Sequence, residues 1–140
     1  MFRMDLSQIP LFAMLRGRLG YLSERQQVIA QNVANSDTPG YTPRDLRPFT
    51  VPGEPGSPSL APVSATLTSP MHLAPPASGH ATGQRPVVSP DSETTLNGNS
   101  VVLEEEMNKM SQARTDYDAA VAFYEQSLAL VQTAAKRPGT

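Results

Sequence analysis

The sequence predicts a mainly α-helical protein in which two long terminal helices pair as a coiled coil and an extended Pro/Ser/Gly-rich middle segment is largely irregular. Toward each end of the chain, apolar residues recur in alternating steps of four and three, which is the heptad seam of paired helices. Between the two seams, residues 42–96 hold 11 prolines, four glycines and seven serines among 55 residues, a composition that does not build a hydrophobic core. The chain therefore divides into an N-terminal helix with its turn at 1–41, a Pro-rich irregular excursion at 42–96, and a C-terminal coiled-coil helix at 97–140.

The first helix is expected to run from Pro10 to Ala34. Proline suits a first helical turn, where its missing N–H is not needed, and Ser7 just upstream can cap the helix. Gly17 and Gly20 each cost ~1 kcal/mol relative to Ala. They are either poor helix residues or positions that let a neighbouring helix approach closely. The predicted seam of this helix consists of Leu15, Leu19, Leu22, Gln26, Ile29 and Val33.

The second helix carries the stronger pattern and should be a rod of roughly 50 Å. Asn99 or Ser100 can cap its start, glutamates 104–106 fill its first turns, and Lys136 and Arg137 close its last turn, as the helix macrodipole favours. Its predicted seam consists of Leu103, Met107, Met110, Arg114, Tyr117, Val121, Tyr124, Leu128, Val131 and Ala135. Beside the seam, the apolar face is widened by Ala113, Ala120, Phe123, Leu130 and Ala134. This seam is longer than the first, so it leaves apolar surface for contacts between subunits.

Within the middle segment, β-branched residues favour two short extended pieces, at Phe49–Val51 and Ala65–Thr68. A tight turn precedes this segment, directly after the first helix. Asn35 tolerates the left-handed conformation that ends helices. Pro39-Gly40 fits the centre of a type II turn with Gly40 at positive φ, and the ring of Tyr41 can fold back onto the helix end.

Composition and single residues argue against several functions. A net charge of −2 without a basic patch excludes nucleic-acid binding, and the absence of cysteine excludes disulfides and thiol catalysis. The longest apolar stretch, Ile9–Leu15, is too short to span a membrane, and its flanks do not favour a cleaved signal peptide. His72 and His80 lack acidic neighbours and are expected to be solvated loop residues. We therefore expect no enzyme, no metal site and no cofactor.

Two parts of the sequence resemble a known family. Ala34-Asn35-x-x-Thr38-Pro39-Gly40-Tyr41, preceded by Ile29-Ala30-Gln31-Asn32-Val33, is similar to the N-terminal signature of the flagellar rod, hook and hook–filament junction proteins. The stretch Leu96-Asn97-Gly98-Asn99-Ser100, continuing to Met107, Met110 and Tyr117, resembles the C-terminal block of one proximal rod subfamily, with the sister proximal rod subfamily as the nearest alternative. The family's turn motif falls here on Asn32, Ala34, Asn35, Thr38, Pro39, Gly40 and Tyr41.

The resemblance implies a structural subunit of the flagellar basal body whose paired terminal helices line an export channel and transmit torque. It implies as partners copies of the chain itself, other rod proteins, the membrane-ring, export-gate and adaptor proteins of the base, and the type III export apparatus. The implied location is the periplasmic rod, reached without a cleaved signal peptide and without membrane insertion. A secreted helical effector or a chaperone-like binding module is the alternative from another class, although neither requires the turn between two matched seams.

Overall fold

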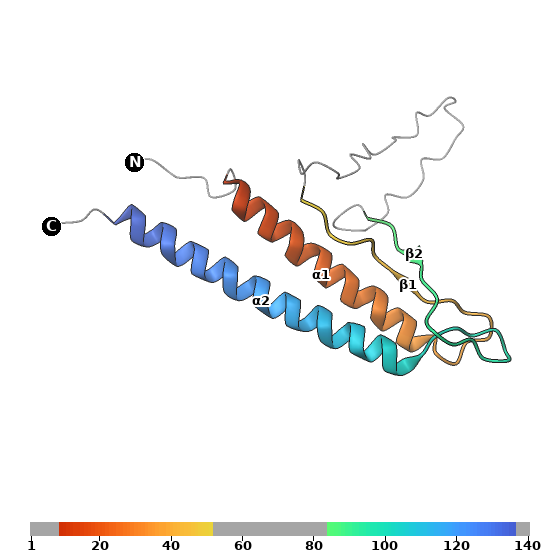
Figure 1. Ribbon diagram of the computed structural model, residues 1–140. Coiled ribbons are helices and arrows are strands. Elements are labelled where there is room, and N and C mark those ends of the chain that lie inside the picture. The colour runs from red at the N-terminus through yellow and green to blue at the C-terminus, as the bar shows by residue number, and fades with distance from the viewer. Residues whose placement is uncertain (1–8, 52–83, 137–140) are drawn as a thin grey trace, which may run out of the picture.

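Two long helices lie side by side along the described part of the chain, which in this computed structural model comprises residues 9–51 and 84–136. The elements are α1 (Pro10–Ala34), β1 (Arg44–Asp45), β2 (Val87–Val88) and α2 (Leu103–Ala135), in that order. The helices are antiparallel, and the start of α1 lies near the last turns of α2 (Figure 1). The predicted mainly helical fold and the predicted bounds of the first helix are confirmed.

The interface between the helices is built on two seven-residue repeats. On α1, Leu15, Leu22 and Ile29 are buried, and on α2 the buried positions are Glu106, Ala113, Ala120 and Ser127. Small side chains at the buried α2 positions let the two backbones approach closely. Near the open end of the pair, the rings of Phe12 and Tyr124 meet edge to face with centroids 5.3 Å apart, a favoured aromatic geometry.

A second face of α1 is covered by the segment that follows the turn. Leu46 is buried against Tyr21 and Val28, and the Phe49 ring packs against Tyr21 with centroids 5.6 Å apart. A Cβ at Gly17 would lie 3.6 Å from the Phe49 ring, in ordinary contact. Gly17 therefore does not allow a second helix to approach closely. Its neighbour is the Phe49 ring, which belongs to the segment that follows the turn.

The two strands pair antiparallel, with Arg44 opposite Val88 and Asp45 opposite Val87. The short extended piece expected at Phe49–Val51 is not part of a strand ladder. Side-chain packing of Phe49 onto α1 takes the place of strand pairing there. The second expected piece, Ala65–Thr68, lies outside the described residues, as do His72 and His80. The described flanks of the middle segment are irregular apart from the two short strands, as predicted, yet Leu46 shows that they contribute to the core.

The helix ends differ from the expected caps. Ile9 precedes α1 without a side-chain cap bond, and Ser7 lies outside the described residues. Asn35 ends α1 at φ −103°, so its predicted left-handed conformation is wrong. Its Nδ2 instead donates to the Gln31 carbonyl at 2.7 Å, which satisfies a helix-end acceptor directly.

The start of α2 is also capped from outside the helix. Val102 is the N-cap residue, so the prediction that Asn99 or Ser100 caps α2 is wrong. The Val102 N–H donates to Asp91 Oδ2 at 2.8 Å. Asn99 and Ser100 are buried before the helix begins, where Asn99 is occupied with contacts to the first turn. The acidic residues at positions 104–106 do lie in the first turn of α2, as the macrodipole favours. The last turn contains no basic residue, because α2 ends at Ala135 and Lys136 is its C-cap residue, so the prediction that Lys136 closes the last turn is wrong. Arg137 lies outside the described residues.

Candidate functional site

The turn after α1 has the conformation that the sequence predicts. Gly40 has φ +71°, and the Tyr41 N–H donates to the Thr38 carbonyl at 3.2 Å. This closes a four-residue turn with glycine at its third position, the pattern of a type II turn. No atom outside its immediate neighbours would lie within 4 Å of a Cβ at Gly40, so its requirement for glycine is conformational rather than steric.

A second glycine turn lies directly against the first. Gly98 has φ +83°, its N–H donates to the Thr95 carbonyl at 2.9 Å, and a Cβ at Gly98 would lie 3.4 Å from the Gly40 Cα. Two backbone hydrogen bonds join the turns: the Gly40 N–H donates to the Asn97 carbonyl, and the Ser100 N–H donates to the Tyr41 carbonyl, both at 3.0 Å. The two sequence motifs that carry the family resemblance therefore form one structure, which we call the turn junction (residues 38–41 and 95–98 with Asn32, Asn99 and Glu106).

Asn99 connects the second turn to the end of α1. Its side chain is 2% exposed, and its Nδ2 donates to the carbonyls of Asn35 at 2.9 Å and Thr38 at 2.7 Å. Its Oδ1 accepts from the Val101 N–H at 2.8 Å. One amide thus supplies partners for two carbonyls near the C-terminus of α1, where helix carbonyls lack partners within the helix.

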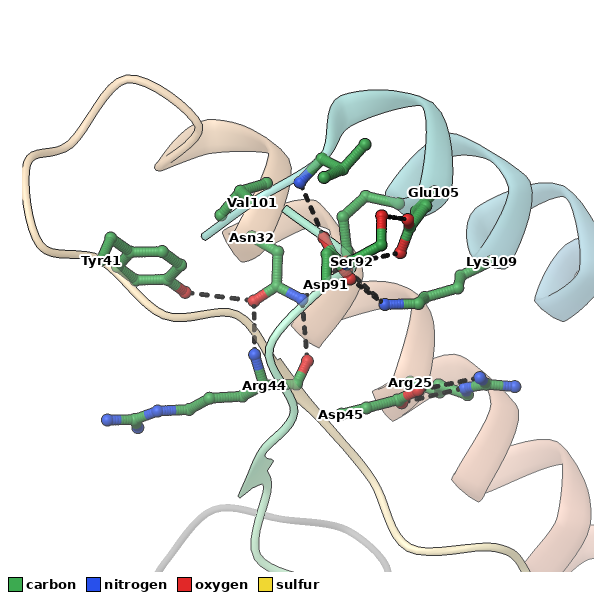
Figure 2. A network of polar contacts seen from close by, with 12 residues as sticks. Arg25, Asn32, Tyr41, Arg44, Asp45, Asp91, Ser92, Val101, Glu105 and Lys109 are labelled. Atoms are coloured by element: carbon green, nitrogen blue, oxygen red, sulfur yellow. Dashed lines mark hydrogen bonds and ion pairs between the residues drawn. The ribbon is translucent and has the colours of Figure 1, made fainter. Parts of the chain in front are cut away.

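Asn32 lies near the end of α1, and its side-chain amide uses all of its hydrogen-bonding capacity. Its Nδ2 donates to the Arg44 carbonyl at 2.7 Å and to Glu106 Oε2 at 2.9 Å. Its Oδ1 accepts from the Tyr41 hydroxyl at 3.1 Å and the Arg44 N–H at 3.0 Å. Asn32 is 1% exposed, and Figure 2 shows it between Tyr41 and Arg44. The predicted return of the Tyr41 ring onto the helix end is confirmed.

The network continues from Asn32 into α2 through two carboxylates and one ammonium. The side chains of Glu106 and Asp91 are fully buried. Lys109 lies between them, with Nζ 2.5 Å from Asp91 Oδ1 and 2.7 Å from Glu106 Oε1. Burial alone lowers the pKa of Lys109, but the hydrogen bonds to Asp91 and Glu106 more than offset this and raise the pKa above its ordinary value. The charged form of Lys109 is therefore the one that the site stabilises.

A separate ion pair fixes β1 to α1. Arg25 Nε and Nη2 bind Asp45 Oδ1 and Oδ2 at 3.0 and 2.9 Å, a two-point geometry that orients both groups. The hydrogen bond to Asp45 raises the pKa of Arg25. Near the start of α2, Ser92 likewise contacts Glu105 (Figure 2).

The predicted motif residues gather at the turn junction. Asn32 is buried and Tyr41 is half-buried, whereas Ala34, Thr38 and Pro39 are exposed. Asn35 is half-buried at the end of α1, and its Oδ1 accepts from the Thr38 hydroxyl at 3.1 Å. Of the motif, Asn32 and Gly40 are the two positions whose side-chain chemistry or backbone conformation the structure uses most specifically.

The predicted interface residues fall into three groups. The buried group consists of Leu15, Leu22 and Ile29. The half-buried group consists of Leu19, Val33, Met110, Tyr117, Val121, Tyr124, Leu128 and Val131. The exposed group is formed by Leu103 and Met107. The helix pair thus leaves part of the predicted α2 seam without cover from α1.

The sequence interpretation missed the polar members of the junction. Glu106 was assigned to helix electrostatics alone, and Asp91 and Lys109 were given no role. One signal was available: Glu106 begins the series Glu106, Ala113, Ala120 and Ser127, in which each member is seven residues from the next. A charged residue in phase with small residues on a helix indicates a buried polar contact.

No group of three or more His, Asp or Glu side chains within 9–51 and 84–136 could hold a metal ion. In the same ranges, neither helix has a segment apolar enough to cross a membrane. The most specific structure that the described residues contain is the turn junction at the end of the helix pair.

Comparison with known proteins identifies the family. The model of the flagella basal body rod protein family matches residues 15–42, which span most of α1 and the first turn. The flagellar basal body rod protein FlgB of Agrobacterium fabrum is 31% identical over 120 residues, covering 81% of this chain and 84% of the relative. FlgB of Escherichia coli is 29% identical over 107 residues (74% and 77%), and FlgB of Proteus mirabilis is 30% identical over 111 residues (75% and 78%).

These relatives bear the name of the subfamily that the Asn97-Gly98-Asn99 motif favours, so the choice between the two proximal rod subfamilies is settled. The chain belongs to the FlgB family of flagellar basal-body rod proteins and is a structural subunit of the proximal rod.

Proposed function

We propose that the α1–α2 pair is the unit that assembles into the rod, and that the apolar side chains left uncovered on α2 bind neighbouring subunits. The observation that carries this proposal is the exposure of large apolar residues on a helix that is already paired. Met107, Phe123 and Leu130 are 61%, 50% and 65% exposed. Side chains of this size, repeated along one helix, are typical of surfaces that become buried on assembly.

The exposed residues lie on two flanks of α2. Phe123 and Leu130 are seven residues apart and share one flank. On the other flank, Met107 and Met110 line a shallow apolar groove of about 270 Å³ with Ala30 and Val33 of α1. Two different surfaces on one subunit suit a heterologous contact, which generates a helical array when it does not close on itself.

In this proposal the turn junction keeps the end of each subunit rigid. Its polar side chains are buried and hydrogen-bonded, so the exit of the chain from α1 and its return into α2 have one geometry. A fixed geometry allows the subunits to pass torque without bending at this end. The chain acts by assembly and catalyses no reaction.

The proposed partners are copies of the chain and other rod proteins, together with the ring, export-gate and adaptor (FliE) proteins at the base of the rod. The helix pairs surround the export channel, and the subunit reaches the periplasmic rod through the type III export apparatus without a cleaved signal peptide. The family resemblance supports this route.

The test uses charged substitutions on the exposed flank. Phe123→Asp and Leu130→Asp leave the buried seam of the helix pair intact, so the chain should fold and be exported at normal levels. A charge in a dry subunit interface costs several kcal/mol, so rods and swimming should be lost. Gln126→Asp is the matched control, because it adds the same charge at an exposed polar position of the same helix. Normal rods in both the Phe123→Asp and the Leu130→Asp strains would exclude this flank as a subunit interface.

A further inference from the structure

Apart from the aromatic contact of Phe12 with Tyr124 at the open end of the pair, the seam between α1 and α2 is almost uniform along its length. On α1 the buried aliphatic residues are Leu15, Leu22 and Ile29, and on α2 the small buried residues are Ala113, Ala120 and Ser127. Each set repeats every seven residues. A shift of one helix along the other by one heptad, which is ~10 Å, would place an aliphatic side chain against a small one again at most positions. The apolar part of the seam therefore distinguishes the native register from its neighbours only weakly.

Two side chains break this uniformity at the closed end of the pair. Glu106 is in phase with Ala113 but is charged and fully buried, and Asn32 is the polar residue that meets it at 2.9 Å. A one-heptad shift would place Ala113 opposite Asn32 and would leave the Asn32 amide and the Glu106 carboxylate without each other. Burying either group without a partner is strongly unfavourable.

Asn99 specifies the same register independently. Its Nδ2 reaches the carbonyls of Asn35 and Thr38 at 2.9 and 2.7 Å, and a Cβ at the neighbouring Gly98 would lie in contact with the Gly40 Cα, at 3.4 Å. These contacts require the residues before α2 to lie against the end of α1. The Asn32–Glu106 pair and the Asn99 contacts are satisfied by one relative position of the helices.

We propose that the polar pairs of the turn junction, and not the apolar seam, set the register of α1 against α2. A single polar residue at a buried heptad position is known to select register in paired helices at some expense of stability. In this chain the selected register fixes where the exposed residues of α2 stand relative to those of α1. It thereby defines the surface that a neighbouring subunit meets.

The experiment measures register directly. The chain contains no cysteine, so Ser23→Cys on α1 and Gln126→Cys on α2, both exposed, can carry one spin label each in the full-length protein. Pulsed electron paramagnetic resonance should give a single population of distances between the two spin labels in the otherwise native chain. The labelled variant that also carries Asn99→Ala and Glu106→Leu should show a second population of distances between the labels. That second distance should be the one expected when α2 is shifted along α1 by one heptad.

The control is Leu22→Ala in the same labelled background. Leu22 is 2% exposed and lies in the seam, so this change weakens packing but leaves the polar pairs intact. It should lower the melting temperature and keep the single native distance. If the Asn99→Ala/Glu106→Leu variant also melts earlier but keeps the single native distance, the polar pairs only stabilise the fold and the proposal is overturned.

If the combined variant loses its helical circular dichroism, the same variant is measured again in a stabilising osmolyte, which favours the folded state without favouring either register. The proposal requires a resolved second distance in that variant, and a single native distance contradicts it. Failure of rod assembly in the Phe123→Asp strain is a separate result, because it concerns the exposed flank and not the register.

Discussion

Replacing Asn32 by Asp tests the central contact of the turn junction with almost no change in volume. The two hydrogen bonds that Nδ2 donates, to the Arg44 carbonyl and to Glu106 Oε2, would each face an oxygen in the variant. At 2.9 Å from Glu106, a second carboxylate would be strongly repelled at neutral pH. The chain can relieve this repulsion by binding one proton between the two carboxyl groups, as closely spaced carboxylate pairs do.

The proton sets the magnitude of the effect. Holding a carboxyl group of ordinary pKa near 4 in its protonated form costs about 4 kcal/mol at pH 7 and about 1.4 kcal/mol at pH 5. The lost bond to the Arg44 carbonyl adds about 1 kcal/mol at either pH. The variant should therefore lose roughly 5 kcal/mol of unfolding free energy at pH 7 and roughly half of that at pH 5. A total stability of about 5–15 kcal/mol is usual for a domain, so the variant should lose between about a third and all of its stability at neutral pH.

The direction of the pH dependence follows from proton binding. The folded variant would hold a proton that the unfolded chain releases above pH 4, so its stability falls as pH rises. Urea denaturation followed by circular dichroism at pH 7 and pH 5 measures the difference. Tyr41→Phe is the control, because it removes one hydrogen bond to Asn32 without adding charge and should cost about 1 kcal/mol at both pH values. Equal losses at the two pH values for Asn32→Asp would refute the assignment of Glu106 as its partner.

Three further outcomes are expected. Rod yield and swimming should decrease in the order Gly, Asn, Ala, Val at position 40, because φ +71° costs a β-branched residue on the order of 1–3 kcal/mol while asparagine adopts it most readily; equal assembly of all four would contradict the turn. Gly98→Ala should lower the urea midpoint more than Gly40→Ala, since φ +83° at Gly98 lies farther than φ +71° at Gly40 from the left-handed region that residues with a Cβ can adopt, and the reverse order would contradict this difference in strain. The contribution of Lys109 should be fully present below pH 10.5, the ordinary lysine value, and be lost as pH rises through its raised folded pKa. Lys109→Met should cost about 2–3 kcal/mol at pH 7, because it leaves two buried carboxylates without their cation, and an alkaline titration that affects this variant as much as the native chain would contradict that role.

The sequence was sufficient where the signals are local. Pro10 and the phase of the apolar residues define α1, and Pro39-Gly40 defines a turn whose conformation depends only on adjacent residues. The seam of α2 was predicted less well. The prediction selected the larger apolar residues, whereas the deepest positions are Ala113 and Ala120, because only small side chains fit where the helices approach most closely.

The polar junction could not be derived in the same way. Glu106 stands among three successive glutamates, all of which suit the start of a helix. What separates it from its neighbours is an amide 74 residues away and a lysine that the fold brings beside it. A contact over that distance depends on the whole chain path, which local patterns do not record.

The distance in sequence between Asn32 and Glu106 has a consequence for folding. The turn junction closes a loop of 74 residues, and the entropy lost in closing a flexible loop grows only with the logarithm of its length. Doubling the intervening chain would therefore weaken the junction by only about 0.6 kcal/mol, whereas the search time for so distant a contact makes folding slower than for a hairpin with a short connection. Evolution can thus lengthen or shorten the connection between α1 and α2 at little expense to the stability of the subunit, provided that the residues at both ends of the loop still meet.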